Sequence, residues 1–242
     1  MQNAVSGSKA RLLADQFNIS KYITRITPSG MQDTYNCTTL EDTDKTYTPG
    51  LKSGTLSAEG LHHGTDTTGT LETLFASLPT NGSIVTAFPN GFTVGKAALL
   101  LSANVGSYNS DAVVSDLVKT TIALTHRDGP LEPGVSLHAL AAEIGTANGT
   151  AVDNGAATTN GGVAHLHVTA IAGISPLVSL KIQHSSNGSV WADLLDLGDF
   201  SAVASERAVV VAETTVNRHL RCVTTFGGTT SSITFNISFA RR

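Results

Sequence analysis

The chain has 242 residues, of which 40% are hydrophobic and 14% are charged, and its net charge is −4. A charge this close to neutral, without a basic stripe, argues against tight binding of nucleic acid through its phosphates. No apolar run approaches the length of a membrane span, so we expect no membrane binding by this chain. Little charge combined with 23 glycines and many Thr, Ser and Val residues favours a mainly β fold with many turns.

The two cysteines, Cys37 and Cys222, lie far apart in the sequence, which favours a reducing folding compartment over a disulfide framework. The N-terminus has no apolar core of the kind a signal peptide requires. We therefore expect folding in a cytoplasm.

Residues 1–9 are expected to form a flexible tail, followed by two strands at 10–15 and 21–27 that flank a turn. The segment Pro28–Gly30 carries a proline and a glycine and is expected to end the second strand.

A long arm is predicted over residues 38–54, because this stretch is polar and charged and has no hydrophobic period. Pro49 and Gly50 predict a turn, and an alternating strand follows near Gly54–Leu61. We expect this arm to remain uncovered by its own body and to pack on another copy of the chain.

The arm also carries a cluster of acidic residues beside a lysine: Glu41, Asp42, Asp44 and Lys45. Paired carboxylates can do acid–base chemistry or bind calcium, although the spacing does not match a calcium loop. A solvated, charged arm is the simpler interpretation, and a third is an acidic wall that repels passing DNA.

One short helix is predicted between Thr70, its candidate N-cap, and Pro79, which stops it. Its apolar face follows the helical spacing through Leu71, Leu74, Phe75 and Leu78. Strands are expected at 83–88, 92–104 and 118–126, with a loop at 105–116, and the N-terminal domain over 10–127 is expected to be a β-sandwich or barrel.

The segment 128–134 carries two prolines and two glycines and is predicted to link two domains. Residues 135–143 fit a strand or a helix, and their surroundings favour a strand; residues 145–162 are expected to form loops or a short edge strand. Six further strands are predicted at 163–172, 177–184, 190–195, 208–213, 219–225 and 232–239. Domain 135–242 is therefore expected to be a second, antiparallel β-sandwich.

No phosphate-binding, zinc-protease or nucleophile-elbow motif is present, so we expect no catalytic residue, no cofactor and no metal. His165 and His167 share one face of a predicted strand and are either part of a metal site, or histidines that face solvent or are hydrogen-bonded. Trp191, the single tryptophan, either packs in the sandwich or forms a surface-binding platform for a sugar.

Two stretches resemble the tail tube proteins of long-tailed bacteriophages. Residues 15–23, DQFNISKYI, are similar to the opening strand–turn–strand of that family, although Asn18 stands where an Asp is more usual. Residues 46–57, TYTPGLKSGTLS, are similar to the end of the family's long loop and the strand after it. Residues 135–242 resemble the β-sandwich appendages that decorate phage tails, through 181–194 and 217–223.

The resemblance implies a virion protein, assembled in the host cytoplasm, that forms stacked hexameric rings with DNA passing through the lumen. Other tail proteins, such as the tape measure and the terminator, would be its partners. It implies an inter-ring arm over 40–53, with Tyr47, Pro49 and Leu51 as anchors and Leu40 and the acidic cluster at its end. Two other hypotheses stay open: a glycan-binding sandwich centred on Trp191, and a cell-wall hydrolase, for which no nucleophile or carboxylate pair stands out.

Overall fold

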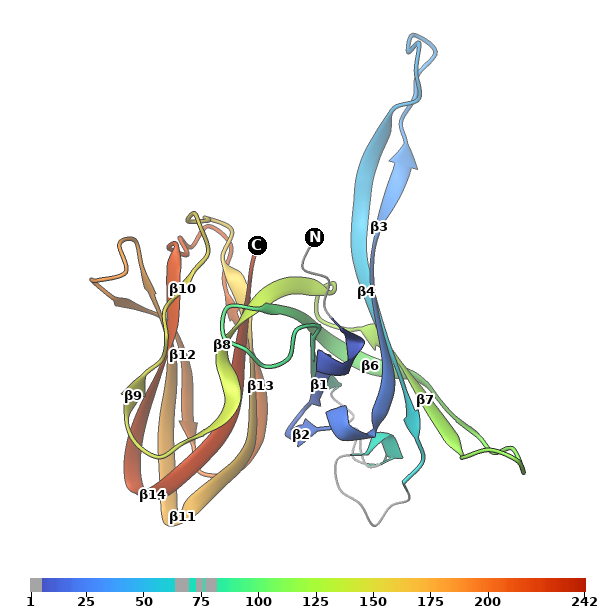
Figure 1. Ribbon diagram of the computed structural model, residues 1–242. Helices are drawn as coiled ribbons and strands as arrows, with labels where there is room; N and C mark the ends of the chain where they lie inside the picture. The colour runs from blue at the N-terminus through green and yellow to red at the C-terminus, as the bar shows by residue number, and fades with distance from the viewer. Residues whose placement is uncertain (1–5, 64–69, 73–75, 77–81) are drawn as a thin grey trace.

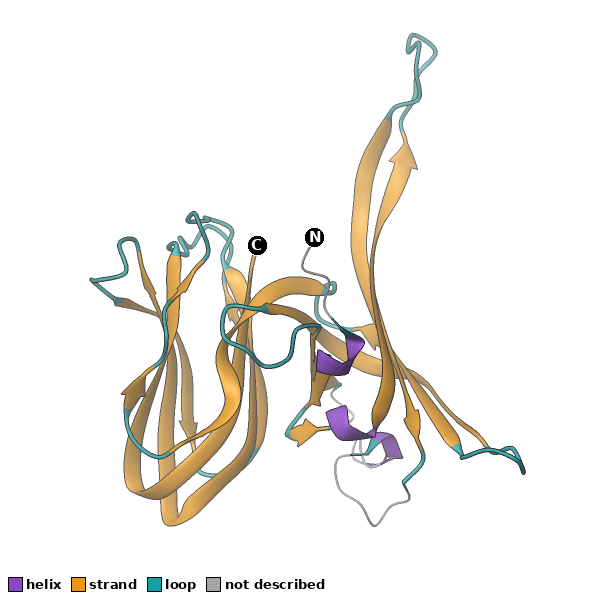
Figure 2. Ribbon diagram, in the orientation of Figure 1, coloured by secondary structure: helices purple, strands orange, loops and turns teal. Residues whose placement is uncertain are grey.

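A computed structural model of the chain describes residues 6–63, 70–72, 76 and 82–242. The fold is mainly β, as predicted, and the described strands pair antiparallel into one continuous 14-stranded sheet. This sheet curls into two lobes that lie side by side, with a long hairpin projecting from the N-terminal lobe (Figure 1; Figure 2).

The N-terminal lobe contains two short 3-10 helices, η1 (Gly7–Lys9) and η2 (Ser20–Tyr22), and strands β1 (Arg11–Ala14), β2 (Phe17–Asn18), β3 (Ile23–Asn36), β4 (Tyr47–Leu61), β5 (Ser83–Phe88), β6 (Ala97–Asp111) and β7 (Lys119–His126). The C-terminal lobe contains β8 (Glu132–Glu143), β9 (Ala147–Asn148), β10 (Val152–Asp153), β11 (Gly162–Ser185), β12 (Ala192–Phe200), β13 (Ala204–Val210) and β14 (His219–Arg241).

The N-terminal core forms where the sheet folds over on itself. Leu56 and Ala58 of β4 and Ile122 and Leu124 of β7 are buried and alternate with more exposed neighbours, as a strand with one covered face requires. They pack in one cluster with apolar residues of β1, β5 and β6. The opposite face of β4 and β7 is left open.

Two bent strands build the C-terminal sandwich. The first half of β11 pairs with the second half of β14, and beyond a bend the second half of β11 pairs with the first half of β14. The register shifts between Gly173 and Pro176, and Gly173 has a φ of 148°, which an L side chain rarely adopts. β11 and β14 therefore run through both layers and enclose the core between them (Figure 1).

Strand β6 connects the lobes. Its part from Ala103 to Asp111 pairs with β7, whereas its part from Ala97 to Leu100 pairs with β8, which in turn pairs with β14. The predicted linker 128–134 lies between β7 and β8, and β8 already begins at Glu132. The division into two domains stays a prediction, since the sheet runs from one lobe into the other.

Several predicted boundaries are wrong. Pro28–Gly30 does not end a strand, and Pro49–Gly50 does not form a turn: both lie inside the paired strands β3 and β4. β3 is an edge strand, and β4 meets β7 only from Thr55 onward, so neither proline has to donate a hydrogen bond to a second neighbour.

The loop predicted at 105–116 is largely the extension of β6 to Asp111, and two pairs of predicted strands merge into β11 and β14. The predicted strand at 135–143 is confirmed within β8. Of the predicted helix, Leu71, Glu72 and Ala76 are helical, whereas Leu74, Phe75 and Leu78 lie outside the described residues. In the predicted tail, Ser6–Lys9 carry η1, and residues 1–5 also lie outside them.

Candidate assembly surface

The predicted arm is the outer part of the β3–β4 hairpin. β7 pairs with β4 only from Thr55 to Leu61, so beyond Gly54 the hairpin is a ribbon of two strands. Residues 29–49 are all exposed, and the ribbon extends away from both lobes (Figure 1). An isolated two-stranded ribbon is only marginally stable in water, so this element gains most if another surface covers it.

Local sequence explains why the ribbon forms at all. Tyr35 pairs with Thr48 and Asn36 with Tyr47, while the register shifts between Gln32 and Thr34. At this bulge a Cβ on Gly50 would lie 2.4 Å from a ring carbon of Tyr35, so the glycine lets the ring lie against the backbone of β4.

The tip of the ribbon, residues 37–46, is a compact turn. Asp42 accepts hydrogen bonds from the backbone N–H and hydroxyl of Thr39 at 2.7 and 3.2 Å, and Cys37 N–H donates to the carbonyl of Thr46 at 2.9 Å. Asp42 therefore shapes the tip, whereas the carboxylates of Glu41 and Asp44 make no ion pair within the described residues.

All eight predicted arm residues lie on this ribbon and are exposed: Leu40, Glu41, Asp42, Asp44 and Lys45 at the tip, and Tyr47, Pro49 and Leu51 on β4. Leu40 is fully exposed, Leu51 is 77% exposed and Tyr47 is 53% exposed. That they contact another copy stays a prediction.

Sequence reasoning missed the other strand of the ribbon. Met31 and Tyr35 on β3 are 65% and 57% exposed. The prediction that Pro28–Gly30 ends the strand leaves them out. Their spacing of four residues places both on one face of an extended strand, which is the signal for them in the sequence.

A second projection, the β6–β7 hairpin, also exposes apolar side chains. Val113, Val114 and Leu117 lie in its tip and are exposed. Asp116 organises this tip by accepting a hydrogen bond from Leu117 N–H at 2.8 Å and pairing with Lys119 at 2.6 Å. The ion pair with Lys119 lowers the pKa of Asp116.

The open face of the N-terminal sheet is polar but carries little charge. Opposite pairs on this face join Thr55 with Thr125, Ser57 with Ala123 and Glu59 with Thr121. Glu59 forms an exposed ion pair with Arg25 at 3.5 Å, which leaves the pair neutral. A surface of this composition offers little attraction to phosphate.

His165 and His167 are buried in the seam between the lobes, on the face of β11 that meets β5 and the β1–β2 turn. His167 Nδ1 lies 2.7 Å from the carbonyl oxygen of Asp15, and Thr86 Oγ1 lies 2.8 Å from His167 Nε2 and 3.0 Å from His165 Nδ1. The Asp15 carbonyl can only accept, so His167 carries its proton on Nδ1. The Thr86 hydroxyl then donates to His167 Nε2 and accepts from His165 Nδ1.

His165 and His167 are therefore buried and hydrogen-bonded within the fold, which is one of the predicted alternatives. Burial lowers the pKa of His165 well below its ordinary value and that of His167 to about 4. In the described part of the chain, no group of three or more His, Cys, Asp or Glu residues is placed to hold a metal ion.

Trp191 lies half-buried beside β12. The guanidinium of Arg221 lies 4.3 Å from the centre of the indole ring and donates two hydrogen bonds to Gln183 Oε1. Arg221 thus covers one face of the ring through a cation–π contact. A sugar platform at Trp191 stays a prediction.

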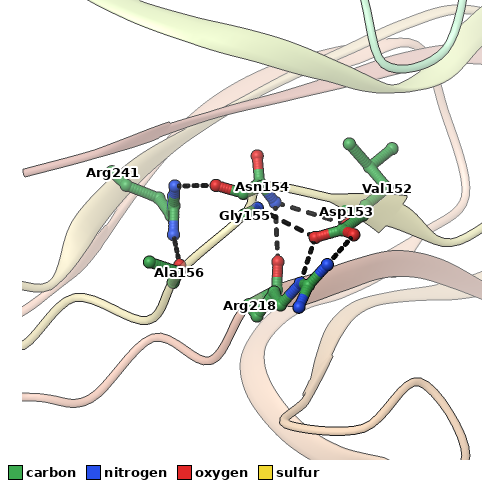
Figure 3. Close-up of polar contacts among 7 residues, drawn as sticks. All are labelled: Val152, Asp153, Asn154, Gly155, Ala156, Arg218 and Arg241. Atoms are coloured by element: carbon green, nitrogen blue, oxygen red, sulfur yellow. Dashed lines mark hydrogen bonds and ion pairs between the residues drawn. The ribbon is translucent and has the colours of Figure 1, made fainter.

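A polar network ties the loop after β10 to the sandwich (Figure 3). Arg218 forms two hydrogen bonds with the carboxylate of Asp153, which also accepts from Gly155 N–H at 2.8 Å. The hydrogen bonds from Arg218 hold the pKa of Asp153 well below its usual range. Arg241 donates to the carbonyls of Asn154 and Ala156 from the other side. These contacts hold the loop between Arg218, which precedes β14, and Arg241 at the end of β14, and they fix its shape.

No family model and no curated protein matches the sequence. Among solved structures, the chain is similar to one in the virion of a native gene transfer agent particle, with 13% identity and a TM-score of 0.42. It is similar to another in the tail of an empty gene transfer agent particle with C6 symmetry, with 14% identity and a TM-score of 0.41. Each match covers 52% of this chain and 96% of the other. At this level the similarity does not identify the family or the function.

No helix among the described residues is long and apolar enough to cross a membrane.

Proposed function

We propose that this chain is a structural subunit that assembles with copies of itself into stacked rings, forming a phage tail tube through which DNA passes. The observation that carries the proposal is the β3–β4 ribbon, whose residues 29–49 are exposed throughout. Its tip and β4 carry three exposed large side chains with apolar surface, Leu40, Tyr47 and Leu51. Covering one leucine side chain stabilises an interface by roughly 1.5–3 kcal/mol. Burial of Leu40 and Leu51 against another subunit would therefore favour association of the ribbon.

Two further features support the proposal. The outer edge of β3 has no partner strand among the described residues, and pairing between subunits is the simplest way to cover such an edge. A contact between unlike surfaces that does not close on itself builds a filament. The weakly charged open face of β4 and β7 suits a lumen that DNA must pass without binding.

The hexameric ring, the virion location, assembly in the host cytoplasm and the tape measure and terminator partners belong to the same proposal and rest on the resemblance of residues 15–23 and 46–57. We also propose that the chain has no catalytic role: in the lobe seam, the buried side chains of His165, His167 and Thr86 bond to one another.

The proposal is tested by removing the ribbon while keeping the body. Residues 32–52 are replaced by Asn-Gly, which joins the paired residues Met31 and Ser53 through a tight two-residue turn. We expect a folded protein, by circular dichroism and thermal unfolding, that forms no tubes in negative-stain electron microscopy.

The matched control is Val190→Ser, which removes an exposed apolar side chain from the C-terminal lobe and should leave the tubes unchanged. Normal tubes from the chain without its ribbon would overturn the proposed function.

A further inference from the structure

A groove lies at the base of the ribbon, on the N-terminal lobe. It consists of three adjoining hollows of about 300, 250 and 490 Å³. The first two share Gly7, Ala10 and Ile26, and the second and third share Ser20. The three hollows therefore lie next to one another along η1, the start of β3 and η2.

One end of the groove is apolar and the other is basic. Its apolar end is lined by Ala10, Ile26, Pro28, Phe88 and Pro89. Arg11 and Lys21 line the basic end, and Lys9 is exposed at the end of η1, two residues before Arg11. None of these three basic side chains has an ion-pair partner within the part of the chain that the structure describes.

The three basic residues Lys9, Arg11 and Lys21 form what we call the basic rim, and two of them are held in place by contacts within the chain. Arg11 Nη1 donates to the carbonyls of Ser8 and Ala10 at 2.9 and 2.8 Å, and Lys21 Nζ lies 4.6 Å from the centre of the Tyr22 ring. Lys9 and Lys21 are exposed and Arg11 is half-buried, and all three lack a counter-charge among the described residues.

The tip of the ribbon has the complementary chemistry. Residues 37–46 contain Glu41, Asp42, Asp44 and Lys45, a net charge of −2, together with the fully exposed Leu40. The ribbon carries this tip away from the groove of its own chain (Figure 1). A ribbon tip that occupies the groove must therefore come from a second copy of the chain.

We propose that the acidic tip of one copy docks in the groove of a second copy, with Leu40 over the apolar end and Glu41 and Asp44 near Lys9, Arg11 and Lys21. This inference rests on the proposed function and names the surface that receives the arm. Asp42 stays engaged with Thr39 and keeps the tip in shape.

The tip of the β6–β7 hairpin is the competing occupant. It exposes Val113, Val114 and Leu117, but its Asp116 is already paired with Lys119. It therefore has less unpaired negative charge to offer the basic rim.

Charge reversal tests the docking. Glu41→Lys with Asp44→Lys changes the tip and spares Asp42; Lys9→Glu with Lys21→Glu changes the rim and spares Arg11. Each double variant should raise the protein concentration needed for assembly at least about tenfold, because like charges then face each other. The chain with all four changes should assemble near the wild-type concentration, measured by light scattering and electron microscopy.

The control Lys96→Glu with Ser186→Glu and Ser189→Glu makes the same total change of charge as the rim variant, at exposed positions outside the groove, and should assemble within about twofold of wild type. If the rim variant assembles normally while the tip variant fails, the docking is wrong and the proposed function stands. Failure of the fourfold variant to recover also overturns the docking. A wild-type chain that never assembles overturns both.

Crosslinking gives a second measurement that does not depend on folding of the charge variants. Cys37 is exposed at the tip and Cys222 is buried, so a Ser6→Cys variant places one further reactive thiol at the groove. A short bismaleimide should join Cys37 of one copy to residue 6 of another, identified by mass spectrometry. The same reagent on a Ser201→Cys variant should give no such product; a Ser6→Cys variant without crosslinks under assembly conditions counts against the docking.

Discussion

At the scale of single residues, Thr86 holds the lobe seam together. Its hydroxyl contacts both His165 and His167, and the chain of hydrogen bonds ends on the carbonyl of Asp15. Asp15 has a φ of 48°, and its side chain accepts from Ile84 N–H at 2.9 Å. The β1–β2 turn is thereby fixed to both β5 and β11.

Replacing Thr86 with Val keeps the shape of the side chain and removes its hydroxyl. Both histidines then lose a partner in a buried site, so we expect the free energy of unfolding to fall by about 1–3 kcal/mol. Urea unfolding measures this. Thr27→Val, on exposed β3, should change stability by less than about 0.5 kcal/mol, and equal losses in the two variants would contradict the assignment.

The sequence predicts part of this seam. The spacing of His165 and His167 places them on one face of a strand. Thr86 lies on β5, 79 positions before His165, and Asp15 lies in the β1–β2 turn, 152 positions before His167. Nothing local in their sequence marks them as the other half of the network.

At the scale of elements, the ribbon is longer than local sequence preferences predict. Pro28, Pro49 and Gly50 are turn-forming residues by local preference, yet all three lie within paired strands. An edge position makes a missing N–H harmless, and Gly50 makes room for Tyr35. The polarity of the arm is visible in the sequence, but its pairing register depends on tertiary position.

Gly50→Val should loosen the ribbon without unfolding the body. The added side chain would displace the Tyr35 ring, which is exposed and free to swing away, so we expect a change in overall stability below about 1 kcal/mol. Amide hydrogens of the ribbon, including that of Cys37, should exchange faster in hydrogen–deuterium exchange. Lys52→Ala on the same strand is the control, and unchanged exchange in Gly50→Val would show that the packing of Tyr35 does not hold the ribbon.

At the scale of the whole molecule, the buried histidines make the joined lobes sensitive to acid. Both pKa values are lowered in the folded protein, so the unfolded chain binds more protons below its ordinary histidine pKa of about 6.5. The stability is fully present above about pH 6.5 and is lost as the pH falls toward the folded value.

We expect the free energy of unfolding to fall by roughly 3 kcal/mol for His167 alone between pH 7 and pH 4. His167→Gln should be less stable at pH 7 and should show a shallower pH dependence, whereas His63→Gln, at an exposed position, should keep the wild-type slope. Parallel slopes for His167→Gln and wild type would refute this origin of the acid sensitivity.

The bent path of β11 and β14 also constrains when the C-terminal lobe can form. Because β14 is a member of both layers, neither layer is complete until that strand has left the ribosome. All the strands of the N-terminal lobe are synthesised before Asp128, so that lobe can begin to fold with its ribbon already exposed while the sandwich beside it is still waiting for its last strand. The half that carries the ribbon is therefore complete first. Under the proposed function, the order of the elements lets two nascent chains meet through their ribbons during synthesis.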